Sequence, residues 1–396
     1  MPVDALEKLR LLGPPTCYEP AEELPLRRPA VPESPDPLRC IYQAVLPGGK
    51  RIALLKTLLT SACERDCLYC AFRRGRDAPR ASFSPDELAR LFIRMHERGL
   101  VEGIFLSSGI AGSGPRTEDL LIDTAEILRR RYGFRGYIHL KIMPGAEREQ
   151  VIAAMRLANR VSVNLEAPNP ERLARLCPHK TFYDELFERL RWIAEVRRTL
   201  PGRWPSATTQ FVVGAAGESD REILLTTQYL LRDLGLARAY FSRFEPIPGT
   251  PLEGHPPTPA LREHRLYESS FLLRDYGFSV DELPFDRTGN LPLDVNPKLA
   301  WARRHLLEAP VEVNTATRGE LLRVPGIGPT GAERILRART QGRLRELGDL
   351  RKLGVRAEAA APFILLAGRR PARQLALWPA EPGAVASDPT PEEGNP

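Results

Sequence analysis

Residues 61–72 read SACERDCLYCAF, and they place Cys63, Cys67 and Cys70, three of the chain's six cysteines, within eight positions. The stretch directly follows an apolar run, Leu54–Thr60, which is predicted to be a strand. In a reducing compartment, clustered cysteines are metal ligands or catalytic groups more often than disulfides. A tetrahedral zinc site needs a fourth Cys or His, and none follows at zinc-finger spacing. Three thiolates instead suit a [4Fe-4S] cluster with one iron open to another ligand.

From Arg51 onwards, short apolar runs alternate with amphipathic stretches, which is typical of parallel strands buried on both faces and joined by helices. The predicted strands are Leu54–Thr60, Gly103–Ser108, Gly136–Ile142, Val161–Glu166, Thr208–Gly214 and Ala239–Glu245. The predicted helices are Pro85–Glu97, Thr117–Tyr132, Glu147–Leu157, Phe182–Thr199, Asp220–Leu234 and Pro259–Tyr276. Six βα units imply an α/β fold with right-handed crossovers, and six is short of the eight that close a full barrel. The sequence therefore predicts a partial (β/α)6 barrel whose functional face lies at the carboxyl ends of the strands.

The C-x3-C-x2-C spacing, with Tyr69 just before the last cysteine, resembles the radical S-adenosylmethionine (SAM) superfamily. The resemblance implies that Cys63, Cys67 and Cys70 hold a [4Fe-4S] cluster whose open iron binds the amino and carboxylate groups of SAM. It also implies that an electron from the cluster cleaves SAM and gives a 5′-deoxyadenosyl radical that takes a hydrogen atom from substrate. Zinc or a cluster without catalytic function is the alternative.

The same resemblance implies SAM contacts at the ends of other strands. The turn after the second strand would meet the amino group, the polar side chains after the fourth strand would meet the ribose, and the glycine turn after the fifth strand would meet the adenine. The implied residues are Tyr69, Ser107, Ser108, Gly109, Asn164, Glu166, Val212, Gly214 and Glu218. The turn after the second strand lacks the acid that is common in the superfamily. Alternatively, polar residues at strand ends merely cap the next loop.

Three further residues are candidates on the barrel. Cys177, in the loop after the fourth strand, could donate a hydrogen atom to a product radical, or it could be a buried structural cysteine. His139 and Lys141 alternate along the third strand, so both could point inward toward substrate, although half-buried polar residues are common in strands.

Residues 313–336 resemble a helix-hairpin-helix. Thr315 or Thr317 starts the first helix, Gly326-Ile327-Gly328 forms a tight turn, and Pro329 opens the second helix. The glycines allow backbone N–H groups at a helix N-terminus to approach a phosphate. The expected DNA-binding residues are Gly326, Ile327, Gly328, Thr330, Gly331, Arg334 and Arg337. Such a hairpin holds the phosphate backbone without reading bases. A hairpin used only for packing or protein contact is the alternative.

Charge supports a polyanionic partner for this region. The net charge of the chain is +7, and residues 311–370 contain twelve Lys and Arg against six acids. A polyanion would be attracted to this segment, although a basic face can also be simply solvated. Residues 347–356, followed by an apolar stretch, look like a degenerate second copy of the hairpin.

The predicted domains are a Pro-rich extended arm (1–50), the barrel (51–297), an all-α helix-hairpin-helix domain (298–370) and a disordered tail (371–396). Within the tail, Gln374–Trp378 resembles the peptide by which bacterial repair proteins dock on the sliding clamp. Neither a secretory signal nor a membrane-length apolar stretch is evident, so a cytoplasmic protein is expected.

The two halves together resemble DNA modification or repair radical SAM proteins that have a C-terminal helix-hairpin-helix. The resemblance implies an enzyme that acts on DNA and receives electrons from a donor such as flavodoxin or ferredoxin. An enzyme that modifies RNA or tRNA bases is one alternative, since phosphate hairpins distinguish the sugars poorly. A DNA-binding protein with a structural or redox-sensing cluster is the other.

Overall fold

The computed structural model describes residues 4–13, 16, 40–45 and 51–371. The chain divides into two compact units. The first unit comprises residues 1–46, 50–270 and 285–293, and the second comprises residues 47–49, 271–284 and 294–396. Among the described residues, no helix is both long enough and apolar enough to cross a membrane.

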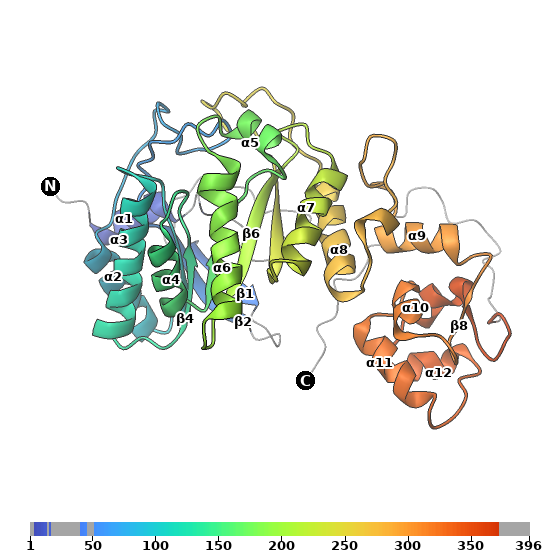
Figure 1. Ribbon diagram of the computed structural model, residues 1–396. Helices are drawn as coiled ribbons and strands as arrows, with labels where there is room; N and C mark the ends of the chain where they lie inside the picture. The colour runs from blue at the N-terminus through green and yellow to red at the C-terminus, as the bar shows by residue number, and fades with distance from the viewer. Residues whose placement is uncertain (1–3, 14–15, 17–39, 46–50, 372–396) are drawn as a thin grey trace. The chain divides into compact units, whose positions relative to one another are not determined.

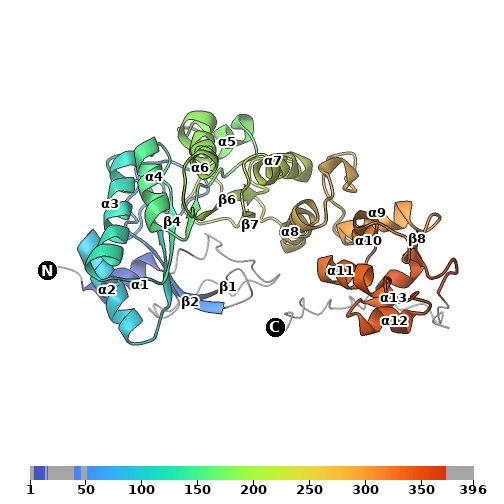
Figure 2. The same ribbon diagram turned by 60° about the horizontal axis from the view of Figure 1, so that its bottom comes forward.

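The first unit is built on a seven-stranded sheet whose strands follow one another in chain order. Its strands are β1 (Ile41–Val45), β2 (Arg51–Leu58), β3 (Gly103–Ser107), β4 (Tyr137–Lys141), β5 (Arg160–Ser162), β6 (Ser206–Val213) and β7 (Arg238–Arg243). The six strands from β2 to β7 are parallel, and β1 pairs antiparallel with β2. The sheet is curled, with helices on its outer face (Figures 1 and 2). These features confirm the predicted partial (β/α)6 barrel.

The chain from α1 to α8 supplies the helical layer. Its helices are α1 (Ala5–Leu12), α2 (Pro85–Glu97), α3 (Gly114–Glu126), α4 (Arg148–Leu157), α5 (Pro170–Leu176), α6 (Glu188–Thr199), α7 (Asp220–Arg232) and α8 (Ala260–Asp275). Two π-helical segments, Ile127–Arg131 and Phe182–Phe187, continue α3 and precede α6. A short 3₁₀ segment, Val280–Glu282, follows α8.

Helix α2 shows how local sequence fixes an element. Ser84 accepts a hydrogen bond from the Glu87 N–H, and Glu87 accepts one from the Ser84 N–H, which together form a capping box. Pro85 occupies the first helical position, where its missing N–H is not needed. Leu88 and Phe92, one turn apart, are fully buried, so the helix begins where predicted and turns its apolar face to the core.

Three elements of the first unit were not predicted. Residues 1–50 are expected to form an extended arm, but their described part contains helix α1 and strand β1. The short helix α5 lies in a segment predicted to be a loop. The predicted strand Val161–Glu166 is also longer than β5, because the backbone leaves the ladder after Ser162 and carries the polar residues of the site.

The second unit contains the C-terminal helices, α9 (Pro297–His305), α10 (Arg318–Arg323), α11 (Pro329–Ala338), α12 (Leu347–Lys352) and α13 (Ala357–Ala360). A two-residue parallel pair, β8 (Val311–Glu312) with β9 (Ile364–Leu365), and a 3₁₀ turn at Ala361–Phe363 complete it. Its core is formed by Leu321, Leu322, Ile335 and other buried apolar residues. The helical C-terminal region agrees with the predicted fold class. The tail peptide Gln374–Trp378 lies outside the described residues.

Candidate functional site

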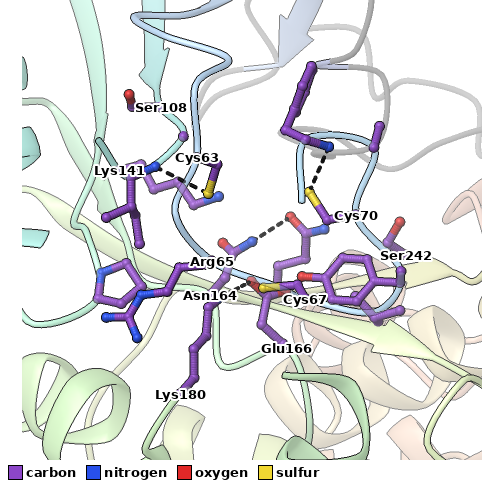
Figure 3. A pocket seen from close by; sticks show the side chains of 18 of the residues that line it. Cys63, Arg65, Cys67, Cys70, Ser108, Lys141, Asn164, Glu166, Lys180 and Ser242 are labelled. Atoms are coloured by element: carbon purple, nitrogen blue, oxygen red, sulfur yellow. Dashed lines mark hydrogen bonds and ion pairs between the residues drawn. The ribbon is translucent and has the colours of Figure 1, made fainter. Parts of the chain in front are cut away.

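A pocket lies where the carboxyl ends of the parallel strands meet, which is the expected functional face of such a barrel. Its wall is made by the cysteine loop after β2 and by residues that follow β3 to β7. Figure 3 shows the labelled side chains around it, with Cys63 and Cys70 on one side and Cys67, Glu166 and Lys180 on the other. The barrel therefore brings together residues far apart in the sequence.

The cysteine loop is held in place by a single guanidinium. Arg80 donates hydrogen bonds to four backbone carbonyl oxygens: those of Ser61 (2.6 Å), Phe72 (3.0 Å), Arg73 (3.1 Å) and Arg76 (3.2 Å). The first of these carbonyls precedes the three cysteines and the others follow them. Arg80 thus joins the two ends of the loop.

Backbone N–H groups point at two of the three thiols. The Ile110 N–H donates to Cys63 Sγ and the Phe72 N–H donates to Cys70 Sγ, both at 3.4 Å. N–H donors favour the thiolate form, which is the form that binds iron. Burial acts in the opposite direction on Cys70 and raises its pKa to about 12.

Cys67 has a different environment. Its thiol is paired with that of Cys177, and this hydrogen bond lowers the Cys67 pKa to about 6. Burial and the neighbouring Cys67 raise the pKa of Cys177 well above its ordinary value. In the side-chain positions of the described residues, no three Cys, His, Asp or Glu side chains converge as a metal-binding group. Cys67 would have to turn from Cys177 to act with the other two thiols.

The donor set nevertheless fits a [4Fe-4S] cluster with a polar cosubstrate. Cys63, Cys67 and Cys70 line one pocket, and three thiols are the ligands such a cluster needs when one iron is kept for another molecule. Ser108 Oγ and Glu166 Oε2, which belong to the same pocket lining, are buried without a hydrogen-bond partner among the described residues. Unsatisfied buried oxygens are costly, so they indicate polar atoms of a ligand as partners.

The pocket collects most of the residues predicted to bind cofactor. These are Tyr69, Ser108, Gly109, Asn164, Glu166 and Val212, together with the three cysteines. The amide of Asn164 donates to Gln210 Oε1 at 3.4 Å. Four other predicted residues, Ser107, Gly214, Glu218 and Cys177, are not among its lining.

The four predicted residues outside the pocket lining have other contacts in the structure. Ser107 is fully buried. The Glu218 carboxylate accepts hydrogen bonds from the Gly214 and Ala216 N–H groups, so it fixes the turn after β6. Cys177 is buried behind Cys67. These placements do not test the roles implied by the resemblance, which stay predictions.

The candidates Lys141 and His139, which alternate along the same strand, have different positions. Lys141 lines the pocket. His139 is buried instead, with its Nε2 at 2.9 Å from Ser162 Oγ, and burial holds its pKa well below the ordinary value.

Lys180 and Arg65 are charged residues that line the pocket and that were not predicted from the sequence. Lys180 lies in the turn after the unpredicted helix α5, and Arg65 lies between the first two cysteines. The Arg65 guanidinium pairs with Glu185 and donates to the His179 carbonyl oxygen. No motif marks either residue, because their positions depend on how the loops after β2 and β5 meet.

The second unit contains the expected hairpin between α10 and α11. Thr317 caps α10 with a capping box to Glu320, and Gly328 is the N-cap of α11. Gly326 has φ 84°, which an L side chain rarely adopts. Ile327 is 1% exposed and anchors the turn in the core. Its N–H donates to the Val324 carbonyl at 3.2 Å, and its own carbonyl accepts from the Lys298 ammonium at 2.7 Å.

Beyond the turn, the predicted DNA-binding residues have different environments. Thr330 and Arg337 are exposed, whereas Gly331 is buried, in a position where a side chain would meet Val355. Arg334 is exposed, and its guanidinium donates to the Leu353 carbonyl at 3.2 Å. Arg334 therefore links this hairpin to the next one.

The degenerate copy has the backbone shape of the first hairpin. Gly354 has φ 71° and is followed by buried Val355, as Gly326 is followed by buried Ile327. The two turns touch, because the Arg356 N–H donates to the Gly326 carbonyl at 3.2 Å. The helix after the second turn, α13, has only four residues.

Comparison with known proteins finds a family match for the segment that contains the three-cysteine pocket and another for the segment that contains the hairpin. Residues 57–230 match the radical SAM superfamily, and residues 308–355 match the helix-hairpin-helix motif. The chain thus contains a radical SAM domain, whose cofactors are a [4Fe-4S] cluster and SAM, and a helix-hairpin-helix motif.

Solved structures with similar folds include three proteins, one of which, TsrM, is described as a radical SAM methyltransferase. Methylornithine synthase (PylB) is 15% identical with a TM-score of 0.45, and the match covers 56% of this chain and 61% of that one. The FeFe-hydrogenase maturase HydG from Carboxydothermus hydrogenoformans has the same identity, TM-score and coverage of this chain, and 51% of its own chain is covered. The methyltransferase TsrM from Kitasatospora setae is 16% identical with a TM-score of 0.38, and the match covers 50% of this chain and 38% of that one. The match therefore spans less than two thirds of each of these proteins.

Proposed function

We propose that the protein is a radical SAM enzyme that acts on DNA, by modifying a base or repairing a lesion. One observation carries the proposal: a single chain combines a three-cysteine pocket with a hairpin whose glycines and exposed helix start suit a phosphate backbone. A radical site needs a substrate, and the hairpin is the part of the chain with the chemistry to hold a polyanion.

In this proposal, Cys63, Cys67 and Cys70 would hold the cluster, which would supply the electron for reductive cleavage of SAM. The residues of the pocket orient SAM. Ser108 and Glu166 offer hydrogen-bonding oxygens, and Val212 offers an apolar contact from the end of β6. The lining excludes bulk water from a radical that would otherwise be lost in side reactions.

The hairpin contributes affinity rather than base specificity. The α11 N-terminus presents Thr330 and nearby N–H groups, and Arg337 is exposed on the same helix. Further exposed cations of this unit are Arg343, Arg345 and Lys352. Contacts of this kind hold phosphates and position the duplex, while the choice of base is made elsewhere.

Anaerobic reconstitution tests whether the protein is an enzyme that cleaves SAM. The full chain, with iron and sulfide content measured, is incubated with SAM and dithionite, and 5′-deoxyadenosine and methionine are quantified. We expect both products from the wild type and none from Cys67→Ala, because two thiols cannot hold the cluster with one defined open iron. Loss of iron and of the visible absorption of the cluster in the variant is the independent readout.

The same assay separates the candidate substrates. Damaged duplex DNA, single-stranded DNA and tRNA are added in turn, and SAM cleavage and changes in the nucleic acid are measured. The proposal expects stimulation and a chemical change with DNA. A change in tRNA alone would replace DNA by RNA as substrate. No SAM cleavage by protein with a complete cluster would overturn the enzyme reading.

Two partners complete the proposal. An electron donor such as flavodoxin or ferredoxin reduces the cluster in the cell. Docking on the sliding clamp through Gln374–Trp378 rests on sequence alone.

A further inference from the structure

Lys180 is a buried cation that the roles above leave unexplained. It lies in the turn after α5, where its N–H donates to the Cys177 carbonyl oxygen at 3.0 Å. Its side chain is 8% exposed, and its ammonium lies 3.4 Å from Glu166 Oε1, whose side chain is 6% exposed. Burying a charge is unfavourable unless it is paired, and here one long ion pair with Glu166 keeps the cation within the pocket lining.

The cysteine loop and this turn are joined directly. The Leu68 N–H donates to the Leu176 carbonyl at 2.8 Å, which places Cys67 beside the start of the turn. Cys67 and Lys180 line the same pocket, and the positive charge of Lys180 acts to lower the pKa of the Cys67 thiol. In Figure 3, Lys180 and Glu166 approach the pocket from the side of Cys67, away from Cys63 and Cys70. Lys180 is therefore next to one specific ligand of the three.

Charge at this position acts on the redox equilibrium of the cluster. Reduction adds one electron without a proton, so the reduced cluster is more negative by one unit. A nearby cation stabilises that form, and burial strengthens the effect because water does not screen it. Glu166, which is paired with Lys180, opposes the effect with its negative charge.

We propose that Lys180 is a positioning residue that raises the reduction potential of the cluster through its charge beside Cys67. The role makes the cluster easier to reduce by a physiological donor. It rests on the cofactor of the proposed function and is independent of the nucleic-acid substrate.

The test is a redox titration of the cluster followed by electron paramagnetic resonance. Wild type, Lys180→Met and Lys180→Arg are reconstituted anaerobically to equal iron content, without SAM or nucleic acid. We expect Lys180→Met to have a more negative midpoint. At the wild-type midpoint its ratio of oxidised to reduced cluster rises about tenfold, which for one electron corresponds to about 59 mV. Lys180→Arg keeps the charge and stays near the wild-type midpoint.

Two further variants sharpen the result. Glu166→Gln removes the opposing charge and is expected to shift the midpoint in the positive direction, which also serves if Lys180→Met fails to retain iron. Arg65→Met is the matched control, because Arg65 lines the same pocket and, like Lys180, is paired with a carboxylate, that of Glu185. We expect it to shift the midpoint less than Lys180→Met does.

Three outcomes would overturn the inference: an unchanged midpoint in Lys180→Met, an equal loss in Lys180→Arg, or an equal shift in Arg65→Met. If the midpoints shift as expected but no SAM is cleaved, the proposed function fails and the role of Lys180 stands. If SAM is cleaved normally and the midpoint potentials of the variants do not move, the role of Lys180 fails and the proposed function stands.

Discussion

Glu166, a residue of the pocket lining, has an unusual backbone conformation. Its φ is 65°, one of two non-glycine residues with positive φ in the described chain. Its N–H donates to the Gln210 carbonyl and its own carbonyl accepts from the Val212 N–H, so the neighbouring strand holds the conformation. Such strain costs about 1 kcal/mol or more and persists where the surroundings enforce it, often at functional sites.

Glu118 is a second unusual residue, and it carries a prediction about pH. It is fully buried in α3, accepts from the Met143 N–H at 2.8 Å, and has its other oxygen unpartnered among the described residues. Burial raises its pKa to about 8 from 4.5. The folded protein therefore retains this proton while the unfolded chain releases it, so stability falls as pH rises from about 4.5 to about 8.

Glu118→Gln removes this titration. We expect the free energy of unfolding of the wild type to fall by about 3 kcal/mol more than that of the variant between about pH 5 and about pH 8. Thermal melting followed by circular dichroism at several pH values measures the difference. Asp123→Asn, on the exposed side of the same helix, also removes a carboxyl whose pKa is raised by burial, and it should change the pH profile less than Glu118→Gln does. Parallel profiles for wild type and Glu118→Gln would contradict the assignment.

At the scale of elements, the two hairpins of the second unit show how turns position helices. Gly326 and Gly354 both have positive φ, and each precedes a buried aliphatic residue. A side chain at Gly326 would collide with the Arg356 carbonyl oxygen. The first turn thus depends on glycine for its conformation and for its close contact with the second.

Gly326→Ala should therefore destabilise the second unit. We expect a loss of at least about 2 kcal/mol, because the left-handed conformation and the collision both disfavour a side chain. Gly328→Ala is the matched control: its φ is −98°, and a side chain there would make only an ordinary contact with the Tyr276 hydroxyl. Calorimetry of both variants compares the unfolding of this unit. Equal melting of the two variants would argue against the role given to Gly326.

Elements with strong local signals were predictable from the sequence. Helix α2 begins at Pro85, as predicted, because Ser84, Pro85 and Glu87 specify its start, and Pro329 marks the start of α11 in the same way. Strand β1 was missed because Ile41–Val45 is short and lies in a Pro-rich stretch, and its pairing with β2 is a tertiary contact. Three cysteines were found by spacing alone. Lys180 was not, because burial beside Cys67 results from packing between distant loops.

At the scale of the whole molecule, the chain consists of two compact units with separate cores. Cofactor chemistry belongs to the first unit and the hairpins to the second. We therefore expect mutations in one core to have effects nearly independent of mutations at the site of the other unit.

This separation predicts two opposite classes of variant. Arg337→Ala should lower DNA affinity and reduce the slope of log affinity against log salt by about 1, because one phosphate contact is lost. Its SAM cleavage without nucleic acid should equal that of the wild type. Cys67→Ala should show the reverse, with normal DNA binding and no SAM cleavage. Fluorescence anisotropy in a salt series measures binding.

Arg130→Ala is the control for charge alone, since Arg130 is exposed on the first unit with a side chain 76% accessible. We expect it to leave the salt slope unchanged. A loss of slope equal to that of Arg337→Ala would mean that binding depends on overall charge rather than on the hairpin.

The four hydrogen bonds of Arg80 have a consequence for how the enzyme acquires iron. A loop that must order around an incoming cluster loses chain entropy at that moment, and the loss weakens binding. Here a guanidinium fixes the carbonyls on both sides of the cysteines, so that entropy is lost when the polypeptide folds. The cysteine loop is then a receptor assembled in advance, in which loading a cluster requires side-chain rotation rather than a new arrangement of the chain.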